Sequence, residues 1–106
     1  MVNNDVLKLI QEYNKNIKIL DKNIKSLKIK ENISNFEGII KNINESNKIF
    51  NKNEILRNKI LELLNNNTSV FILYKNLGIC IDEENYEEAV KIKEEIQNYN
   101  EYSKTI

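Results

Sequence analysis

The chain is predicted to be an all-α protein, a small antiparallel helical bundle with coiled-coil character and a C-terminal helical hairpin. Its 106 residues include no proline and two glycines. Little in the sequence therefore interrupts a helix, and hairpin turns that need positive φ are hard to build. Apolar residues also recur at alternating steps of three and four, the pattern of a helix with one buried stripe. A chain of this length forms a single domain with a modest core, which we place over residues 1–106.

The longest regular pattern lies in the first thirty residues. Its apolar positions step by four and three residues in turn, as the a and d positions of a heptad do. We name these seven residues the apolar ladder: Val6, Ile10, Tyr13, Ile17, Leu20, Ile24 and Leu27. The ladder predicts a helix over residues 5–30, with Asn4 or Asp5 as the N-cap. Because an apolar stripe of this length needs cover, we expect it to pack against the rest of the chain or against a partner.

A second register is predicted after a corner at residues 31–34. Ser34 and Glu37 fit a capping box, so a helix is expected to begin at Asn35 and to lie antiparallel to the first. Its predicted stripe is Ile33, Phe36, Ile40, Ile43 and Phe50. After residues 51–53 comes a short apolar helix that contains Ile55, Leu56, Ile60, Leu63 and Leu64. The pattern leaves open whether these central helices, residues 35–64, are continuous.

The middle helices carry more apolar positions than one stripe needs. The additional positions are Ile39, Ile49, Ile55 and Ile72. They predict that these helices are central in the bundle, and any apolar surface that is left over is a natural site for a partner or a second copy.

The last third predicts a helical hairpin over residues 69–101. Three asparagines at residues 65–67 are expected to end the preceding helix, with Thr68 or Ser69 capping the next. Residues 70–74 alone would fit a buried strand. A helix is preferred because helical spacing continues through Val70, Tyr74, Leu77 and Ile81. After a turn at residues 84–85, the last helix has the stripe Tyr86, Ala89, Ile92, Ile96 and Tyr99, and residues 100–106 are expected to fray.

The residue types exclude most catalytic chemistry. The chain contains no histidine, which is the commonest general base, a common metal ligand and the usual partner of a nucleophilic serine or cysteine. The single cysteine, Cys80, lies between apolar residues and is expected to be buried and inert. P-loop, dinucleotide-binding and zinc motifs are missing from the sequence. We therefore predict a protein that is not an enzyme and has no cofactor, no metal and no small-molecule substrate.

Charge is balanced overall but unevenly placed. Residues 1–30 hold seven lysines against three acids, a net of +4, whereas residues 82–101 have a net of −6. Such a chain could fold its ends together or pair head to tail with a copy of itself, unless the two solvated faces merely differ. The acidic residues near the predicted turn fit a solvated corner better than a cation site. They are Asp82, Glu83, Glu84, Glu87 and Glu88.

The lysines of the first helix keep helical spacing. Those that form a basic strip are Lys15, Lys18, Lys22 and Lys25. The strip has no arginine and no interleaved aromatic residue, and the whole chain is neutral, so we do not expect nucleic acid as the partner.

The N-terminus does not show the basic and then apolar pattern of a signal peptide, and no apolar run reaches membrane-spanning length. We expect a cytoplasmic protein without a membrane partner. Asn, Ile and Lys make up about half of the residues, which is typical of an AT-rich genome. Many of the asparagines are accordingly interpreted as surface residues without a function.

Residues 77–96 resemble the UVR motif. The resemblance is carried by an acidic turn and then by Tyr86-Glu87, Ala89-Val90, Ile92, Lys93, Glu94 and Ile96. This two-helix hairpin occurs in bacterial excision-repair subunits, in some Clp-family ATPases and in the adaptor that partners a protein-arginine kinase. The resemblance implies a docking module that pairs with another such hairpin. Two features depart from the motif: bulkier residues at 79–81 replace its small pair, and Lys93 replaces an arginine.

Taken together, these patterns predict a non-catalytic protein–protein interaction module, an adaptor or an inhibitor-like binding protein, whose partner is another protein, itself or both. The predicted partner-binding residues are Ile10, Tyr13, Ile17, Leu20, Ile24, Tyr86, Glu87, Ala89 and Lys93. The alternatives are a structural homo-oligomeric coiled-coil protein and a secretion or export chaperone, the latter by analogy of size and fold only. A nucleic-acid binder that uses the lysine strip has the least support.

Overall fold

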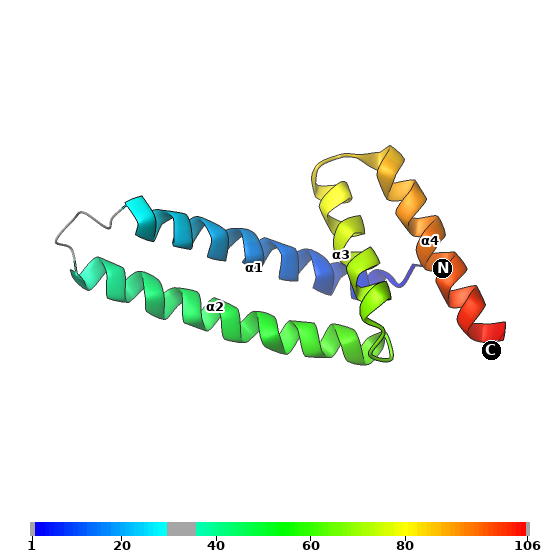
Figure 1. Ribbon diagram of the computed structural model, residues 1–106, viewed down its shortest axis with the longest axis horizontal. Coiled ribbons are helices and arrows are strands. Elements are labelled where there is room, and N and C mark those ends of the chain that lie inside the picture. The colour runs from blue at the N-terminus through cyan, green and yellow to red at the C-terminus, as the bar shows by residue number, and fades with distance from the viewer. Residues whose placement is uncertain (1, 30–35, 106) are drawn as a thin grey trace.

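The computed structural model describes residues 2–29 and 36–105 and has four α-helices within those ranges (Figure 1). They are α1 (Asn4–Ile29), α2 (Phe36–Leu63), α3 (Thr68–Asp82) and α4 (Tyr86–Thr105). α1 and α2 lie antiparallel and form a long two-helix arm, and α3 and α4 form a hairpin at one end of it. The molecule is elongated, with extents of 60 × 28 × 18 Å. The predicted class, an antiparallel all-α bundle, is confirmed.

The first helix is capped by Asn3. The Oδ1 atom of Asn3 accepts hydrogen bonds from the backbone N–H groups of Asp5 (2.9 Å) and Val6 (3.3 Å). These bonds satisfy two of the amides that a helix start leaves without partners. The prediction of Asn4 or Asp5 as the N-cap was wrong by one or two residues, because Asn3 offers the same side-chain chemistry one step earlier.

The second helix is continuous through residues 51–53, which settles the question that the sequence leaves open. It begins at Phe36 in the described part of the chain. The predicted corner at residues 31–34, and with it Ser34, Ile33 and the start at Asn35, lies outside the described residues.

The turn between α2 and α3 is built from asparagine in place of glycine. Asn65 and Asn66 have positive φ, 55° and 61°. The Asn66 N–H donates to the Leu61 carbonyl (2.7 Å) and the Asn65 N–H to the Glu62 carbonyl (3.2 Å), which is the Schellman pattern. Asparagine tolerates this left-handed backbone better than other residues with a side chain.

The N-cap of α3 is the third asparagine of this run. Asn67 has extended backbone angles, and its side chain accepts a hydrogen bond from the Val70 N–H at 3.2 Å. The prediction of Thr68 or Ser69 as the cap was wrong, because both residues already belong to the first turn of the helix.

The turn between α3 and α4 repeats the Schellman pattern. Glu84 takes the left-handed position with φ 59°, and the Asn85 N–H donates to the Cys80 carbonyl at 2.8 Å. The α4 helix then begins at Tyr86 and continues through Thr105. The expected fraying from residue 100 was therefore wrong for the backbone of residues 100–105.

The core lies where the N-terminal half of α1 meets α3, α4 and the end of α2. α3 is its central element, because it contributes the largest group of buried side chains in the described ranges. The buried apolar residues are Val6 and Ile10 from α1, Ile60 from α2, Val70, Phe71, Tyr74, Leu77 and Cys80 from α3, and Ala89, Ile92 and Ile96 from α4. Cys80 is buried, as predicted.

Three specific contacts fix how α1 crosses α3. The Tyr74 hydroxyl accepts a hydrogen bond from the Asn3 N–H at 2.9 Å. Gly78 allows a close approach, because a Cβ atom there would lie 2.9 Å from Asn14 Nδ2 and 3.0 Å from Ile10 Cγ2. Tyr13 also packs edge-on against Phe71, with ring centroids 5.7 Å apart. α1 is thus held to the hairpin at its N-terminal half.

Several predicted core positions of the middle helices are in fact exposed. Ile55 is 69% exposed and Ile72 is 55% exposed, so they do not widen the buried stripes. The predicted α2 stripe of Ile40, Ile43 and Phe50 also faces solvent. The reason is that a different face of α2 packs on α1, as the hydrogen bonds between these two helices, described below, show.

Candidate interaction surfaces

The apolar ladder of α1 is buried at one end only. Val6 and Ile10 are fully buried, whereas Tyr13, Ile17, Leu20 and Leu27 are half-buried and Ile24 is 51% exposed. α3 covers the buried end through the Gly78 crossing. The ladder is therefore a core stripe near the hairpin and an open stripe further along the arm.

The contact between α1 and α2 contains a series of hydrogen bonds between polar side chains. The Asn16 side chain donates a hydrogen bond to Asn53 Oδ1 (2.8 Å), and the Asn53 amide donates to the Tyr13 carbonyl (3.1 Å). Further along the arm, the Asn23 amide donates to Ser46 Oγ at 3.2 Å. The Asn42 amide donates to the Asn23 carbonyl at 3.4 Å. These asparagines connect the two helices, so their interpretation as surface residues without a role was wrong.

We call the positions of α1 and α2 that face each other the seam. They are Leu9, Tyr13, Asn16, Leu20, Asn23 and Leu27 on α1, and Ile39, Asn42, Ser46, Ile49, Asn53, Leu56 and Ile60 on α2. All are buried or half-buried, and their spacing of three and four is that of a heptad repeat. The real seam of α1 is thus turned by one residue from the predicted ladder at Asn16 and Asn23.

This rotation leaves an apolar face on one side of the arm. Ile17 and Ile24 each follow a seam residue of α1 by one position, as Ile43 and Phe50 do on α2. One residue turns a helix by about 100°, and in an antiparallel pair this turn points both helices toward the same side. Ile24, Ile43 and Phe50 are between 44% and 54% exposed, and Ile17 is half-buried. We name these four residues the apolar face. Two exposed polar residues, Asp21 and Asn47, also follow a seam residue by one position and lie between them on the same side.

The apolar face continues the surface that α3 covers. Ile10 also follows a seam residue by one position, and it lies directly under Gly78 of α3. The hydrogen bonds Asn16–Asn53 and Asn23–Ser46 place Ile17 level with Phe50 and Ile24 level with Ile43. The arm therefore has one side that is occupied by α3 near the hairpin and is open and apolar beyond it.

The hairpin residues predicted to bind a partner divide into two groups. Ala89 is buried in the core, where its small side chain faces α3, and so it serves the fold rather than a direct contact. Ile10 of α1 is likewise internal. Glu87 and Lys93 are exposed, and Tyr86 is 62% exposed. Val90, also exposed, follows Tyr86 by four residues and was missed as a surface residue.

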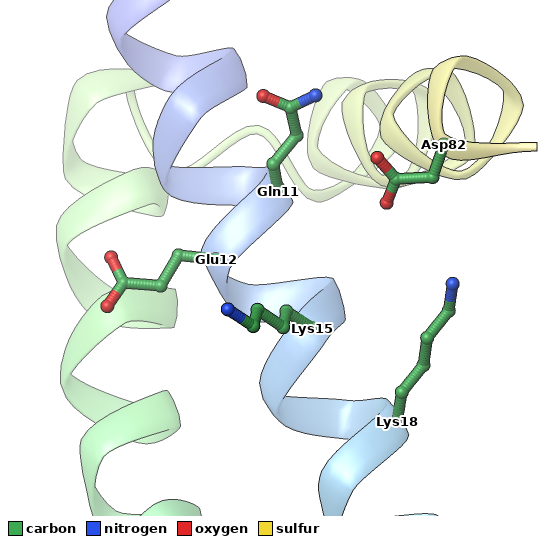
Figure 2. A pocket seen from close by; sticks show the side chains of 5 residues that line it. All are labelled: Gln11, Glu12, Lys15, Lys18 and Asp82. Carbon is green, nitrogen blue, oxygen red and sulfur yellow. The ribbon is translucent and has the colours of Figure 1, made fainter.

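A shallow open depression lies between α1 and the end of α3 (Figure 2). It is lined by Gln11, Glu12, Lys15, Lys18 and Asp82. Lys18 extends toward Asp82, whereas Lys15 extends away from it. The two acids and two lysines balance each other. The depression therefore has no net charge with which to select a small ionic ligand.

The predicted solvated character of the acidic corner agrees with the structure. All five of its acids are exposed. Among the described residues, no three His, Cys, Asp or Glu side chains gather closely enough to hold a metal ion.

None of the described helices combines the length and the apolar composition that crossing a bilayer requires.

No protein-family model, curated protein or solved structure matches the chain. The resemblance of residues 77–96 to the UVR motif therefore stays an expectation, although the hairpin that it implies is present as α3 and α4.

Proposed function

We propose that this protein is a non-catalytic protein–protein interaction module whose arm receives an amphipathic helix of another protein. One observation carries the proposal. The apolar face presents two isoleucines and a phenylalanine to solvent, Ile24, Ile43 and Phe50, on the side of the arm that α3 already covers at its other end.

The geometry of the face defines the partner. Ile17 and Ile24 are seven residues apart, as are Ile43 and Phe50, a distance of about 10.5 Å along each helix. A helix with apolar residues at heptad spacing would place its side chains between these two rows, as in other helix-in-groove complexes. It would lie beyond the end of α3 and complete a three-helix arrangement with α1 and α2.

The hairpin supports the same role as a second contact element. Tyr86, Val90 and Lys93 form an exposed stripe on α4, at steps of four and three residues. The resemblance to the UVR motif implies that such a hairpin docks on another protein. A structural homo-oligomer, in which a second copy covers the apolar face, is the alternative.

The test compares two isoleucines of one helix. Ile43→Asp changes the apolar face, whereas Ile55→Asp changes a more exposed isoleucine (69% against 44%) that precedes a seam residue and so lies on the opposite side of the arm. Tagged protein is used to capture partners from the native cell, and each captured protein is quantified by mass spectrometry. We expect Ile43→Asp to reduce a specific partner at least tenfold and Ile55→Asp to leave it unchanged.

Circular dichroism on both variants verifies that they remain helical. Equal losses in the two variants, or no loss in either, would contradict the proposal. Light scattering distinguishes the homo-oligomer, because a self-associating face would lose its dimer in Ile43→Asp without any other protein being involved.

A further inference from the structure

The side of the arm opposite the apolar face is basic. Seven lysines each precede a seam residue by one position, so the turn of about 100° per residue points them all to this side. They are Lys8, Lys15 and Lys22 on α1 and Lys41, Lys48, Lys52 and Lys59 on α2, and all are exposed. We name this set the basic face. The sequence-based strip of four lysines found two of these residues and missed the entire row on α2.

The basic face has two parallel rows with a regular spacing. On α1 the lysines are seven residues apart, and on α2 the pairs Lys41–Lys48 and Lys52–Lys59 have the same separation, about 10.5 Å. The Asn16–Asn53 hydrogen bond places Lys15 level with Lys52 across the seam. Glu12 and Glu45 are the acids that occupy the corresponding positions between these lysines.

These lysines are not neutralised by ion pairs inside the molecule. Within the described ranges, the ion pairs are Lys25–Asp21 (3.0 Å) and Lys91–Glu88 (4.0 Å), and neither involves a lysine of the basic face. Two facing rows of unpaired cations create a positive potential that attracts an anionic partner.

The complementary surface is present on the same chain. α4 has four exposed glutamates in two pairs, Glu87–Glu94 and Glu88–Glu95, and the members of each pair are seven residues apart. Lys91 lies between the pairs and forms an ion pair with Glu88 at 4.0 Å, which leaves the surface with a net negative charge. Their separation along the helix matches that of the lysines. Asp82, Glu83 and Glu84 at the adjacent turn add to the negative charge, and all three are exposed.

We infer that the basic face of one copy binds the acidic surface of α4 from a second copy. We choose α4 of a second copy because its charge is complementary to that of the basic face. The two lysine rows and the two glutamate rows share the same seven-residue spacing, so α4 lying along the arm can pair its glutamates with both rows. Nucleic acid fits the face less well. The basic face contains no arginine and no aromatic side chain for stacking on bases, and the chain as a whole is neutral.

The experiment uses two charge-reversed variants of the full chain. Lys15→Glu/Lys52→Glu reverses the charge at two lysines that lie level across the arm, and Glu88→Lys/Glu95→Lys makes α4 basic. Sedimentation velocity over a concentration series measures self-association at low salt. We expect each variant alone to associate at least tenfold more weakly than the unchanged protein, because like charges then face each other. We expect an equimolar mixture of the two to regain association, because the reversed arm again meets a reversed α4.

The control is Lys18→Glu/Lys25→Glu, which makes the same charge change on lysines of α1 that lie outside the basic face. It should associate as the unchanged protein does. Added salt should weaken association of the unchanged protein, because exposed charges are screened over about 10 Å at 0.1 M ionic strength. Circular dichroism confirms that each variant is folded.

Three results would overturn the inference. The unchanged protein could stay monomeric at low salt, the mixture could fail to regain association, or the control could weaken association as strongly as the arm variant. Binding of a short DNA duplex that Lys15→Glu/Lys52→Glu abolishes, without any change in self-association, would assign the basic face to nucleic acid instead. The Ile43→Asp variant should self-associate as the unchanged protein does in this experiment. The test of the basic face can therefore fail without contradicting the proposal for the apolar face, and the reverse is also true.

Discussion

The two ends of the arm are stabilised by different interactions. At its base, near the hairpin, α1 contributes Val6 and Ile10 to a core in which both are fully buried. At its tip, residues 20–27 meet residues 37–46 through hydrogen bonds such as Asn23–Ser46, while Ile24 and Ile43 face solvent beside them. The same heptad spacing thus supports an apolar core at one end and, at the other, a seam of half-buried apolar residues and hydrogen-bonded polar residues.

The difference predicts unequal stability along the arm. Burying an isoleucine side chain contributes about 1.5–3 kcal/mol, whereas a net hydrogen bond contributes about 1 kcal/mol. The base should therefore open only with global unfolding, and the tip should open at a lower free energy. The hydrogen-bonded asparagines of the seam also have a structural role, because paired polar side chains fix the register of two helices more specifically than apolar contacts do.

The largest effect is expected in the core at the base. Leu77→Ala removes a fully buried side chain of α3 and should lower the free energy of unfolding by about 3 kcal/mol. Ile72→Ala, on the exposed side of the same helix, is the matched control and should change it by less than about 0.5 kcal/mol. Urea denaturation measures both. Similar losses in the two variants would mean that α3 is not the central element.

A smaller effect is expected in the polar seam. Asn53→Ala removes the hydrogen bonds to Asn16 and to the Tyr13 carbonyl from a buried position. The loss should be about 1–2 kcal/mol, because the half-buried Asn16 amide and Tyr13 carbonyl then lose their partner. Asn51→Ala, at an exposed position of the same helix, is the control.

Hydrogen exchange then tests where the loss occurs. Amides of the arm from Asn53 and Asn16 to the tip should exchange faster in Asn53→Ala, while those of α3 should keep their relative protection. A uniform increase across the molecule would show that base and tip unfold as one unit, and the proposed difference between them would be lost.

A still smaller effect is expected where α1 crosses α3. Gly78→Ala places a methyl group 2.9 Å from Asn14 Nδ2, which is itself held by a hydrogen bond to the Lys75 carbonyl. Overpacking should outweigh the gain in helix propensity, for a net loss of about 1 kcal/mol. Thermal unfolding followed by circular dichroism measures the change, and a stabilised variant would show that the crossing can relax.

The smallest effect should be a gain. Glu84 holds a left-handed backbone conformation that costs a residue with a side chain about 1 kcal/mol. Glu84→Gly should relieve this cost and stabilise the hairpin by about 0.5 kcal/mol, since glycine also loses more entropy on folding. Urea denaturation with Glu83→Gly as the control separates this effect from the removal of one negative charge.

The sequence predicted the helices well because their pattern is dense and few residues interrupt it. It predicted the wrong inward face of α1 because the prediction followed apolar residues alone. It therefore turned Ile17 and Ile24 inward, whereas the residues that face α2 are Asn16 and Asn23, each one residue earlier. Asn16 and Asn23 face inward because they form hydrogen bonds with Asn53 and Ser46 of α2, which is distant in the sequence. A signal did exist, since Asn16 and Asn23, like Ser46 and Asn53, are seven residues apart.

The candidate surfaces were predicted in part for the same reason. Ile17 and Ile24, which are predicted to bind a partner, are half-buried and exposed in the structure, but they were assigned to a stripe that also included the buried Ile10. The lysine row of α2 was missed because its members belong to one surface only after α1 and α2 are aligned. Such a surface depends on the register between two helices, which no single helical pattern contains.

The length of the arm has a practical consequence for how the molecule behaves in solution. Its radius of gyration is 17.3 Å, whereas a compact chain of this size would have about 13 Å. A rod-like particle drags more water and diffuses more slowly than a sphere of equal mass. On a sizing column, a single 12.5 kDa copy should consequently run ahead of a globular standard of the same weight. Elution volume alone would then suggest a pair where only one chain is present.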